Sequence, residues 1–504
     1  MYKKTLLEQF LYISEKRAQA IVLRNQTDQI SYAQLRAKVL AVAGFFKKIG
    51  INPGDRVALA VENSMDYVVA FYAVWMAGGV TVALNPQAKL YEIKNVLQHC
   101  VAKFLLIDKQ NEANVKLLTE LDVRLVTLFD NDLEDVYHWQ HALECKPDNN
   151  WRDIKESSLA QIIYTSGTTG NPKGVMLSHS NLMCNVKDII GYLKLTRKDS
   201  VLNVLPFHYC YGNSVLHSHV CVGASVVLAN TMAFPQDTLE IIRQLSVTGF
   251  SGVPSTYSLF LTHSDWADNP PRLRYLTQAG GPMGKNLTEK LVKACDSSTK
   301  IFVMYGQTEA TARICWLPPD LLHKKLGSVG ISVASSKLEI RNLQGQKLAP
   351  YQVGEICING PSVMQGYWGN PTATSQALVG GWLKTGDLGY LDDDGFLFIK
   401  GRNSDMIKVG AHRINPMELE EVINQLTFVR ESAVFGVEDE VFGQKLRALV
   451  VINEASGNLM QLKKHCREYL PAHKIPKEIT TVTLLPKTAS GKIKRHQLIE
   501  LLPD

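Results

Sequence analysis

Short apolar runs alternate with helical stretches over about residues 1 to 150, and this alternation constrains the fold most strongly. Two of the runs are residues 51–61, INPGDRVALAV, and residues 103–108, KFLLID. When strands and helices take turns along a chain, the strands pair in parallel and the helices cross over between them. We therefore predict an α/β fold built on parallel sheets.

The pattern changes further along the chain, which indicates more than one domain. A chain of 504 residues also exceeds what one hydrophobic core usually holds. From about 325 to 402, short strands and turns such as SKLEIRN, GEICING and GFLFIKG predict a small β-rich subdomain. The last hundred residues look like a separate unit. We place the boundary after residue 402, with residues 403–504 forming a small α+β lid.

One uncharged stretch, residues 67–84 (YVVAFYAVWMAGGVTVAL), has the length of a membrane span. Its Gly78–Gly79 pair and the alternating residues that follow fit a buried helix, a glycine C-cap and a buried strand better. The N-terminus lacks an uninterrupted signal-peptide core. Nine cysteines without a C-x-x-C pair favour reduced thiols. We expect a cytoplasmic protein with no membrane span.

The net charge of +6 is concentrated near the C-terminus. Residues 461–495 carry nine Lys or Arg against Glu468 and Glu478, so the remainder is about neutral. A nucleic-acid partner is not predicted, because the segment lacks interleaved aromatic residues and any known binding motif. We interpret the segment as a basic lid over an anionic nucleotide.

A loop rich in glycines and hydroxyls follows the apolar residues Ile162–Tyr164, within QIIYTSGTTGNPKGVMLSH (residues 161–179). Such a loop suits a polyphosphate, because glycines let backbone N–H groups approach an anion, hydroxyls donate hydrogen bonds, and Lys173 adds a charge. It is not a Walker A loop, because Pro172 stands where that motif requires glycine. A solvated Gly/Thr turn is the alternative.

The segment YTSGTTGNPKGV resembles the signature loop of the adenylate-forming (AMP-binding) superfamily, which includes acyl-CoA synthetases, adenylation domains of peptide synthetases and firefly-type luciferases. In that family the loop holds the β- and γ-phosphates of ATP while a carboxylate attacks the α-phosphorus. The resemblance implies an ATP-phosphate site made by Thr165, Ser166, Gly167, Thr168, Thr169 and Lys173.

A second motif, YGQTE at residues 305–309, also resembles the family. It implies that Tyr305 and Gly306 border the adenine, that Thr308 contacts the α-phosphate and that Glu309 is a ligand of Mg²⁺. The resemblance also assigns Gly280 and Gly281, within RYLTQAGGPM, to a small-residue strand that shapes the adenine site and the acyl pocket. The segment GFSGVPSTYSLF (residues 249–260) reads as strand-like.

Two more motifs complete the resemblance. In WLKTGDLGY, Asp387 matches the aspartate that binds both ribose hydroxyls, a suitable role for a carboxylate with two acceptor oxygens. Arg402 lies on the ribose side. In LPKTASGKIKR, Lys492 matches the catalytic lysine of the lid. With the motifs in order, the resemblance covers essentially the whole chain.

His208 lies in PFHYCYG, which resembles the segment lining the acyl pocket of the family, and this implies a position near the substrate carboxylate. A buried core histidine is the alternative. The nearby His217, His219 and Cys221 superficially suggest a metal site, but their spacing fits no zinc pattern and a helix would splay the two histidines apart.

The implied fold is a large N-terminal domain, with two parallel-type α/β subdomains and a small β-rich one, and a mobile C-terminal lid. The implied activity converts a fatty or aryl acid, in fatty acid metabolism, to acyl-AMP and then to a thioester, with ATP, Mg²⁺ and CoA as partners. The phosphopantetheine of a carrier protein is the alternative acceptor, and a non-catalytic nucleotide-binding regulator a third possibility. An α-amino acid is disfavoured because His208 replaces the aspartate that would bind its ammonium group.

Two positions depart from the family pattern. Ser404, at the lid hinge, stands where Asp or Lys is usual. Beside Gly410, Ala411 stands where acyl-CoA synthetases have the glycine that borders the pantetheine tunnel. A methyl group at this position narrows the predicted tunnel.

Overall fold

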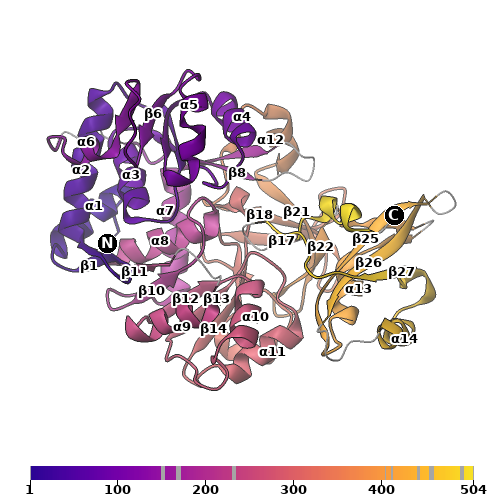
Figure 1. The fold of residues 1–504 in the computed structure, drawn as a ribbon. Coiled ribbons are helices and arrows are strands. Elements are labelled where there is room, and N and C mark those ends of the chain that lie inside the picture. The colour runs from indigo at the N-terminus through magenta and orange to yellow at the C-terminus, as the bar shows by residue number, and fades with distance from the viewer. Residues whose placement is uncertain are drawn as a thin grey trace.

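The computed structural model describes residues 2–148, 154–165, 172–229, 234–402, 405–409, 412–439, 443–452, 459–488 and 493–502. These residues form four sheets. Figure 1 shows two large sheets with their helices in the first part of the chain, a smaller group of strands beside them, and the C-terminal strands at one side.

The first large sheet contains the strands that the alternating pattern predicted. They are β3 (Arg56–Ala60), β4 (Val80–Ala83), β5 (Ala102–Ile107), β6 (Arg124–Thr127), β7 (Val136–His138), β8 (Leu159–Thr165), β9 (Lys173–Ser178) and β19 (Gly366–Tyr367). Their order is β19-β9-β8-β4-β3-β5-β6-β7. The strands from β3 to β8 pair in parallel, which confirms the prediction. At one edge, β9 and β19 add antiparallel strands.

The second large sheet collects the next strands and also two from the N-terminus. They are β1 (Ile21–Arg24), β2 (Gln29–Ser31), β10 (Ser200–Asn203), β11 (Ser225–Leu228), β12 (Gly249–Gly252), β13 (Tyr275–Gln278), β14 (Lys300–Tyr305), β15 (Cys315–Trp316) and β16 (Ile331–Ser332). Their order is β16-β15-β14-β13-β12-β10-β11-β1-β2. The N-terminal β1 pairs in parallel with β11, about two hundred residues away.

Helices cover both faces of both sheets. Between the sheets lie α1 (Leu6–Lys16), α2 (Tyr32–Lys48), α3 (Met65–Met76), α7 (His179–Leu193) and α8 (Cys210–Val222), whose apolar residues share one core with both sheets. On the outer face of the first sheet lie α4 (Leu90–Cys100) and α5 (Val115–Leu118). On the outer face of the second lie α9 (Pro235–Gln244), α10 (Pro254–His263) and α11 (Lys285–Ala294). A short α6 (Trp139–Leu143) packs on α2.

Side chains within the strands follow this layering with the two-residue period of a strand. In β3, Val57 and Leu59 belong to the shared core, whereas Ala58 and Ala60 belong to the outer core under α4 and α5. Both faces of a parallel sheet are buried in this way, so its strands read as nearly continuous apolar runs. The sequence pattern of the first 150 residues has this origin.

The long uncharged stretch is a helix and a strand, as predicted. Ser64 caps α3 by accepting a hydrogen bond from the N–H of Tyr67, and the helix ends before Gly78, whose φ is 86°. β4 follows and is buried throughout. In the described part of the chain, no helix is long and apolar enough to cross a membrane.

Two predictions of local structure are wrong. The strand-like segment from 249 to 260 is a strand only over β12, and α10 begins at Pro254. Proline favours the first turn of a helix, because its fixed φ suits the helix and its missing N–H would have no partner there. The prediction of a strand at Gly280 and Gly281 is also wrong, since β13 ends at Gln278.

The small β-rich subdomain is present as predicted. It contains β17 (Lys337–Arg341), β18 (Gly354–Asn359), β20 (Leu378–Val379), β21 (Trp382–Leu391) and β22 (Leu397–Arg402), with α12 (Pro371–Ala377). The strands pair antiparallel. Between β18 and α12 the chain returns to the first large sheet as β19, so this subdomain and the sheet share an edge.

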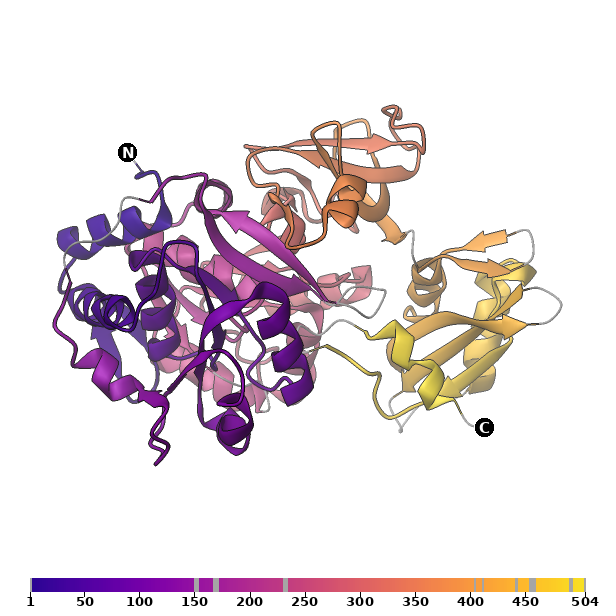
Figure 2. The ribbon, with the colours of Figure 1, turned by 90° about the horizontal axis from the view of Figure 1, so that it is seen from above.

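The C-terminal domain has a sheet and cores of its own. Its elements are β23 (Ile407–Val409), β24 (His412–Ile414), α13 (Pro416–Ile423), β25 (Val429–Asp439), β26 (Gly443–Ile452), α14 (Leu459–Tyr469) and β27 (Glu478–Thr481). Figure 2 shows it beside the rest of the molecule. An ion pair of 4.0 Å joins Lys285 to Glu421 across the two parts. Both side chains are exposed, so this pair contributes little stability.

Candidate active site

Parallel strands bring the central predicted residues to one edge of the second large sheet. His208 follows β10, Gly280 follows β13, and Tyr305 ends β14. These strands run in the same direction, so their carboxyl ends lie at the same edge. In open α/β sheets, ligands bind in the crevice outside that edge.

The described ends of the predicted phosphate loop lie on two antiparallel paired strands, β8 and β9. Thr165 ends β8 and pairs with Lys173, the first residue of β9, so both belong to strands rather than to a loop. The Thr165 hydroxyl donates to the carbonyl oxygen of Lys173 at 3.5 Å. The predicted phosphate ligands Ser166, Gly167, Thr168 and Thr169 lie outside the described residues.

A tyrosine that sequence reasoning missed connects the hairpin to the YGQTE motif. The ring centroid of Tyr367 lies 5.1 Å from Lys173 Nζ, and its hydroxyl donates to Glu309 Oε1 at 2.9 Å. Burial, followed by the Glu309 charge, raises the pKa of Tyr367 above its usual value. Tyr367 therefore remains a neutral donor and holds Glu309 beside Lys173. Its residue type carried no signal, and only the pairing of β19 with β9 places it here.

Glu309 and Thr308 begin a short 3₁₀ helix, η2 (Thr308–Ala310), directly after β14. The Thr308 hydroxyl lies 3.5 Å from Cys210 Sγ at the start of α8. Among the described residues, Tyr367 is the hydrogen-bond partner of one Glu309 oxygen and the other oxygen has none. A carboxylate oxygen of this kind suits Mg²⁺, a cation that prefers oxygen ligands and usually keeps several waters. The residues present therefore fit that ion.

Asp387 is buried between two predicted neighbours. Its Oδ2 accepts a hydrogen bond of 2.5 Å from the Tyr305 hydroxyl, and its Oδ1 accepts one of 2.9 Å from Arg402 Nε. Asp387 pairs with Arg402 in the register of β21 and β22. The Asp387 charge raises the pKa of Arg402, and burial together with Asp387 raises that of Tyr305. A carboxylate has about four acceptor sites, so two remain for a ligand.

His208 is not a satisfied core histidine. Its Nε2 is buried without a hydrogen-bond partner among the described residues. Burial lowers the pKa of His208 to about 4, so the imidazole is neutral at physiological pH. A buried ring nitrogen without a partner costs free energy, of the order of 1–3 kcal/mol. An unpartnered buried nitrogen favours a ligand-binding role over the alternative of a packing residue.

Two glycines admit close approaches of the backbone. A Cβ at Gly306 would lie 1.8 Å from the carbonyl oxygen of Ala312, so no other residue fits between η2 and the segment after it. Gly280 has a φ of 88°, and a Cβ there would lie 3.1 Å from Val253 Cγ1. Gly281 follows beside Pro254. These glycines keep the edge of the second sheet open beside Tyr305.

The predicted lid residues are not described. Ser404, Gly410, Ala411 and the candidate catalytic residue Lys492 lie outside the described residues. Their neighbours are held by ion pairs: Arg495 lies 2.9 Å from Glu420 Oε1 and 3.5 Å from Asp405 Oδ2. Arg495 thereby ties the chain after Lys492 to the segment that begins at Asp405.

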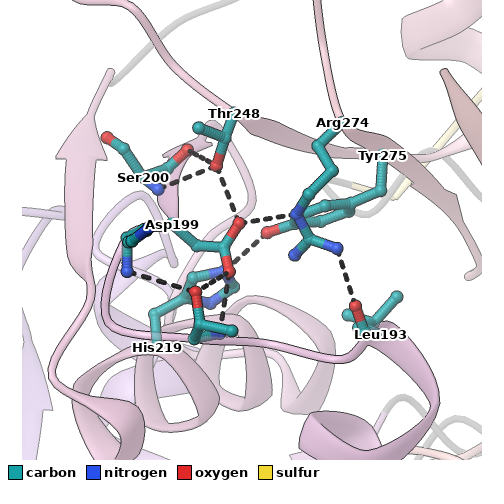
Figure 3. Close-up of polar contacts among 9 residues, drawn as sticks. Leu193, Asp199, Ser200, His219, Thr248, Arg274 and Tyr275 are labelled. Atoms are coloured by element: carbon teal, nitrogen blue, oxygen red, sulfur yellow. Dashed lines mark hydrogen bonds and ion pairs between the residues drawn. The ribbon is translucent and has the colours of Figure 1, made fainter. Parts of the chain in front are cut away.

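The two histidines of α8 form hydrogen bonds with tyrosine hydroxyls. His217 Nδ1 lies 2.9 Å from the Tyr72 hydroxyl, whereas His219 Nε2 lies 2.6 Å from that of Tyr275. Figure 3 shows His219 and Tyr275 beside Asp199, whose carboxylate accepts hydrogen bonds from Arg274 and Thr248. Within the described ranges, no group of three His, Cys, Asp or Glu side chains could hold a metal ion.

The Asp199 network lies at the edge of the second sheet opposite the candidate site. Asp199 precedes β10, and Arg274 precedes β13. Burial raises the pKa of Asp199, but hydrogen bonds from Arg274 and from the N–H of Thr196 outweigh it and hold the pKa below its usual value. Arg274 also donates to the carbonyl oxygen of Leu193 at the end of α7. We regard this buried network as structural.

The two stacked sheets, the small β-rich subdomain and the grouped motifs define an adenylate-forming enzyme. Residues 12–368 match the family described as AMP-binding enzyme, and residues 418–492 match the AMP-binding enzyme C-terminal domain. The chain belongs to the AMP-binding enzyme family.

Relatives match over nearly the whole chain. A 2-succinylbenzoate–CoA ligase of Bacillus licheniformis is 34% identical over 470 residues, which cover 93% of this chain and 94% of that protein. A Geobacillus protein of the same name is 31% identical over 479 residues, covering 94% and 93%. Among solved structures, Bacillus subtilis o-succinylbenzoate CoA synthetase with its acyl-adenylate intermediate has a TM-score of 0.87 at 29% identity, covering 97% of each chain. ATP-bound MatB of Rhodopseudomonas palustris has a TM-score of 0.90 at 26% identity, covering 99% of each.

Proposed function

We propose that this enzyme activates an aryl carboxylic acid with ATP and passes the acyl group to the thiol of CoA. The observation that carries the proposal is the chain of contacts from Lys173 through Tyr367 to Glu309, with Thr308 next in sequence. It joins the phosphate-binding hairpin to the motif that follows β14. Relatives named as CoA ligases of an aryl acid support the acid class and the acceptor.

The first half-reaction makes an acyl-adenylate. A carboxylate oxygen of the acid attacks the α-phosphorus of ATP, the bond from that phosphorus to the pyrophosphate oxygen breaks, and pyrophosphate leaves. Such a step needs positioning and charge neutralisation rather than covalent help from the protein. Thr165 and Lys173 hold the pyrophosphate side, and Thr308 contacts the α-phosphate. Mg²⁺, held through Glu309, neutralises phosphate charge when bound.

The nucleoside and the acid are held by other groups. Asp387 accepts hydrogen bonds from the ribose hydroxyls while Arg402 and Tyr305 hold its carboxylate in place. Gly280, Gly281 and Gly306 leave room for the adenine and the acid. The neutral His208 offers its unpartnered Nε2 to the carboxylate of the acid. Lys492 stabilises the charge between the carboxylate and the α-phosphate when the lid closes.

The second half-reaction transfers the acyl group. The thiol sulfur attacks the acyl carbonyl, the thiol proton is lost, and AMP leaves. We propose that residues 403–504 are a mobile lid that turns about Ser404, so that Gly410 and Ala411 then border the pantetheine arm. CoA is the first choice of acceptor, and a carrier protein with the same arm remains the alternative.

The proposed aryl acid is narrower than the substrate class expected from the sequence. Sequence reasoning left a fatty and an aryl acid open and placed the enzyme in fatty acid metabolism, and the 2-succinylbenzoate ligases give that metabolism no support. A non-catalytic regulator is disfavoured, because a pure nucleotide binder needs neither Lys492 nor Glu309. A cytoplasmic location stays a prediction.

Pyrophosphate exchange tests the proposed function directly. We expect exchange of labelled pyrophosphate into ATP that depends on an aryl acid and Mg²⁺ and needs no thiol, because adenylate formation precedes transfer. The measurement is the exchange rate with a panel of aryl and fatty acids, with and without CoA. Exchange only with CoA present would contradict the two-step reaction. Its absence with every acid would favour the regulator.

The role of Asp387 has its own test. Replacing Asp387 by asparagine should raise the apparent KM for ATP by about 10- to 100-fold, because the ribose loses hydrogen bonds to a charged acceptor. The same measurement is made with 2′- and 3′-deoxy-ATP. The native enzyme should use both analogues poorly, whereas D387N should barely distinguish them from ATP.

Asp394→Asn is the matched control, since this exposed carboxylate pairs with Lys325 instead. It should leave the KM for ATP unchanged. If D387N penalised the deoxy analogues as strongly as the native enzyme does, Asp387 would not hold the ribose.

A further inference from the structure

A pocket of about 270 Å³ lies at the edge of the second large sheet opposite the candidate active site. A water molecule takes up about 30 Å³ in the liquid, so this volume has room for a small ligand. One wall comes from the N-terminal segment at Arg17 and Arg24, and the other from the turns before β10 and β11. The parallel pairing of β1 with β11 brings the two walls together. The pocket therefore lies where the N-terminal segment joins the rest of the sheet.

Four cationic side chains line the pocket, those of Arg17, Arg24, Arg197 and Lys198. The two N-terminal arginines are half-buried, and the other two side chains are exposed. Within the part of the chain that the structure describes, none of the four forms an ion pair with a carboxylate. Like charges gathered around one small volume repel one another, so an anion placed between them is favoured.

The two half-buried arginines keep donors free for a ligand. Nη1 of Arg17 donates to the carbonyl oxygen of Arg197 at 3.3 Å. Nη2 of Arg24 donates to the carbonyl oxygen of Leu245 and, at 3.0 Å, to Ser200 Oγ. A guanidinium has five N–H donors, so these bonds leave several on each side chain. Among the described residues, the buried Nε of Arg24 has no hydrogen-bond partner.

Asp199 also lines the pocket, but its charge is already used. Its two oxygens accept four hydrogen bonds, two from Thr196 and one each from Thr248 and Arg274. Figure 3 shows the contacts of Asp199 with Thr248 and Arg274, and Ser200 beside them. A carboxylate has about four acceptor sites, so none remains for the pocket. The four cations therefore gain no counterion from Asp199.

Serine hydroxyls add uncharged donors to the wall. Ser200 is 6% exposed and its hydroxyl accepts from Arg24, but its own proton has no acceptor among the described residues. Ser225, at the start of β11, contributes a second hydroxyl. A ligand of this pocket must supply acceptors and negative charge, because the wall supplies donors and positive charge. A phosphate group has both, and guanidinium groups bind its oxygens as a fork.

We propose that this pocket binds a phosphate dianion, either as inorganic phosphate or as the phosphate group of a monoester. The bound anion lies between the N-terminal segment and the turns before β10 and β11 and holds the two walls together. The site is separate from that of ATP, because it lies at the opposite edge of the second sheet. The alternative is that Arg17 and Arg24 serve only to hold the carbonyl oxygens of Arg197 and Leu245.

The first test is calorimetric titration of the whole chain with inorganic phosphate and with glycerol 3-phosphate. A non-hydrolysable ATP analogue and Mg²⁺ are present throughout, so that the predicted phosphate loop is already occupied. Ionic strength is held constant, because salt screens exposed charges. We expect saturable binding of one anion per chain. The anion that binds more tightly shows whether the pocket takes free phosphate or a monoester.

Hydrogen exchange locates the bound anion without any substitution. Under the same conditions, saturating phosphate should slow amide exchange in peptides that cover residues 17–24 and 197–200, because the anion holds these two segments together. Peptides from the C-terminal domain serve as the internal control and should exchange at an unchanged rate. Slower exchange confined to other parts of the chain would overturn the proposal.

Variants assign the binding to the pocket. R24Q should raise the Kd for phosphate by about 10- to 100-fold, the usual effect of losing hydrogen bonds from a charged donor. Because R24Q also weakens the contact with Leu245, the double variant R197Q/K198Q provides a second measurement at two exposed positions. It should raise the Kd by about 10-fold. The matched control is K194Q, which removes an exposed lysine of the same turn outside the pocket and should keep the Kd within a few-fold.

Two results of the titrations would overturn the proposal. The first is the absence of saturable binding of either anion at constant ionic strength, which would leave the arginines with their carbonyl contacts alone. The second is a native Kd in both R24Q and R197Q/K198Q, because the anion would then bind elsewhere. The carboxylic acid takes no part in these measurements, so either result leaves the proposed function untouched.

Discussion

Replacing Lys492 by alanine is expected to slow acyl-adenylate formation by about 10²–10³-fold, the usual cost of losing one preorganised electrostatic donor. Thioester formation from supplied acyl-AMP should remain within a few-fold of the native rate. The reason is that, in the proposed function, this lysine meets the reacting centre only in the closed state that forms the adenylate. A group that acts on one transition state affects only that step. The two rates are measured by pyrophosphate exchange and by single-turnover thiolation.

Lys494→Ala is the matched control, because it removes a lysine two positions away and should leave both half-reactions unchanged. Neither substitution removes the ion pairs of Arg495 with Glu420 and Asp405. The two variants therefore differ in which lysine is lost. If K492A slowed adenylation and thiolation equally, the lysine would be a structural group of the lid. Unchanged adenylation would place the catalytic charge elsewhere.

Replacing Ala411 by leucine is expected to abolish thioester formation while sparing pyrophosphate exchange. Gly410 and Ala411 are the two residues between the paired strands β23 and β24. In that pairing Ile407 lies opposite Ile414, and Val409 lies opposite His412. In the proposed thiolation state this end of the paired strands borders the pantetheine arm. A close-packed channel leaves no room for three additional carbon atoms. The measurement is thiolation from supplied acyl-AMP.

Ala411→Gly is the opposite change at the same position. It should leave thiolation unchanged or raise it, since one methyl group is removed from the channel, and exchange should be unaffected. Comparing CoA with a phosphopantetheinyl carrier protein at matched acyl-AMP then decides the acceptor. Turnover with CoA far below that with the carrier protein would reverse our first choice. Normal thiolation by A411L would show that the tunnel lies elsewhere.

The motifs of the candidate site could be recognised in the sequence because each of them is local. The phosphate hairpin, the YGQTE motif and the segment around Asp387 each combine a strand, a sharp turn and a few polar groups within about ten residues. The order of these motifs predicted the family, which the match over residues 12–368 confirms. The parallel first sheet was equally predictable. Both faces of its strands are buried, so each strand appears in the sequence as a nearly continuous apolar run.

Errors arose where a residue's environment depends on distant parts of the chain. A helix replaced the expected strand at Pro254, since tertiary packing settles how far a short apolar run continues as a strand. The pairing of β1 with β11 could not be predicted, because no local sequence pattern indicates it. Tyr367 was overlooked because a tyrosine after a glycine is ordinary, and its contact with Glu309 joins residues 58 positions apart.

By itself, the sequence determined the class of enzyme, the order of its motifs, the parallel sheets and the helix–glycine–strand nature of residues 67–84. Each depends on periodicity or on residue types that lie close together in the chain. Only the tertiary structure decided that Tyr367 links Lys173 to Glu309 and that Arg402 and Tyr305 share Asp387. The physical reason is that hydrogen-bond satisfaction is a property of packed neighbours, and packing brings together residues that the sequence keeps far apart.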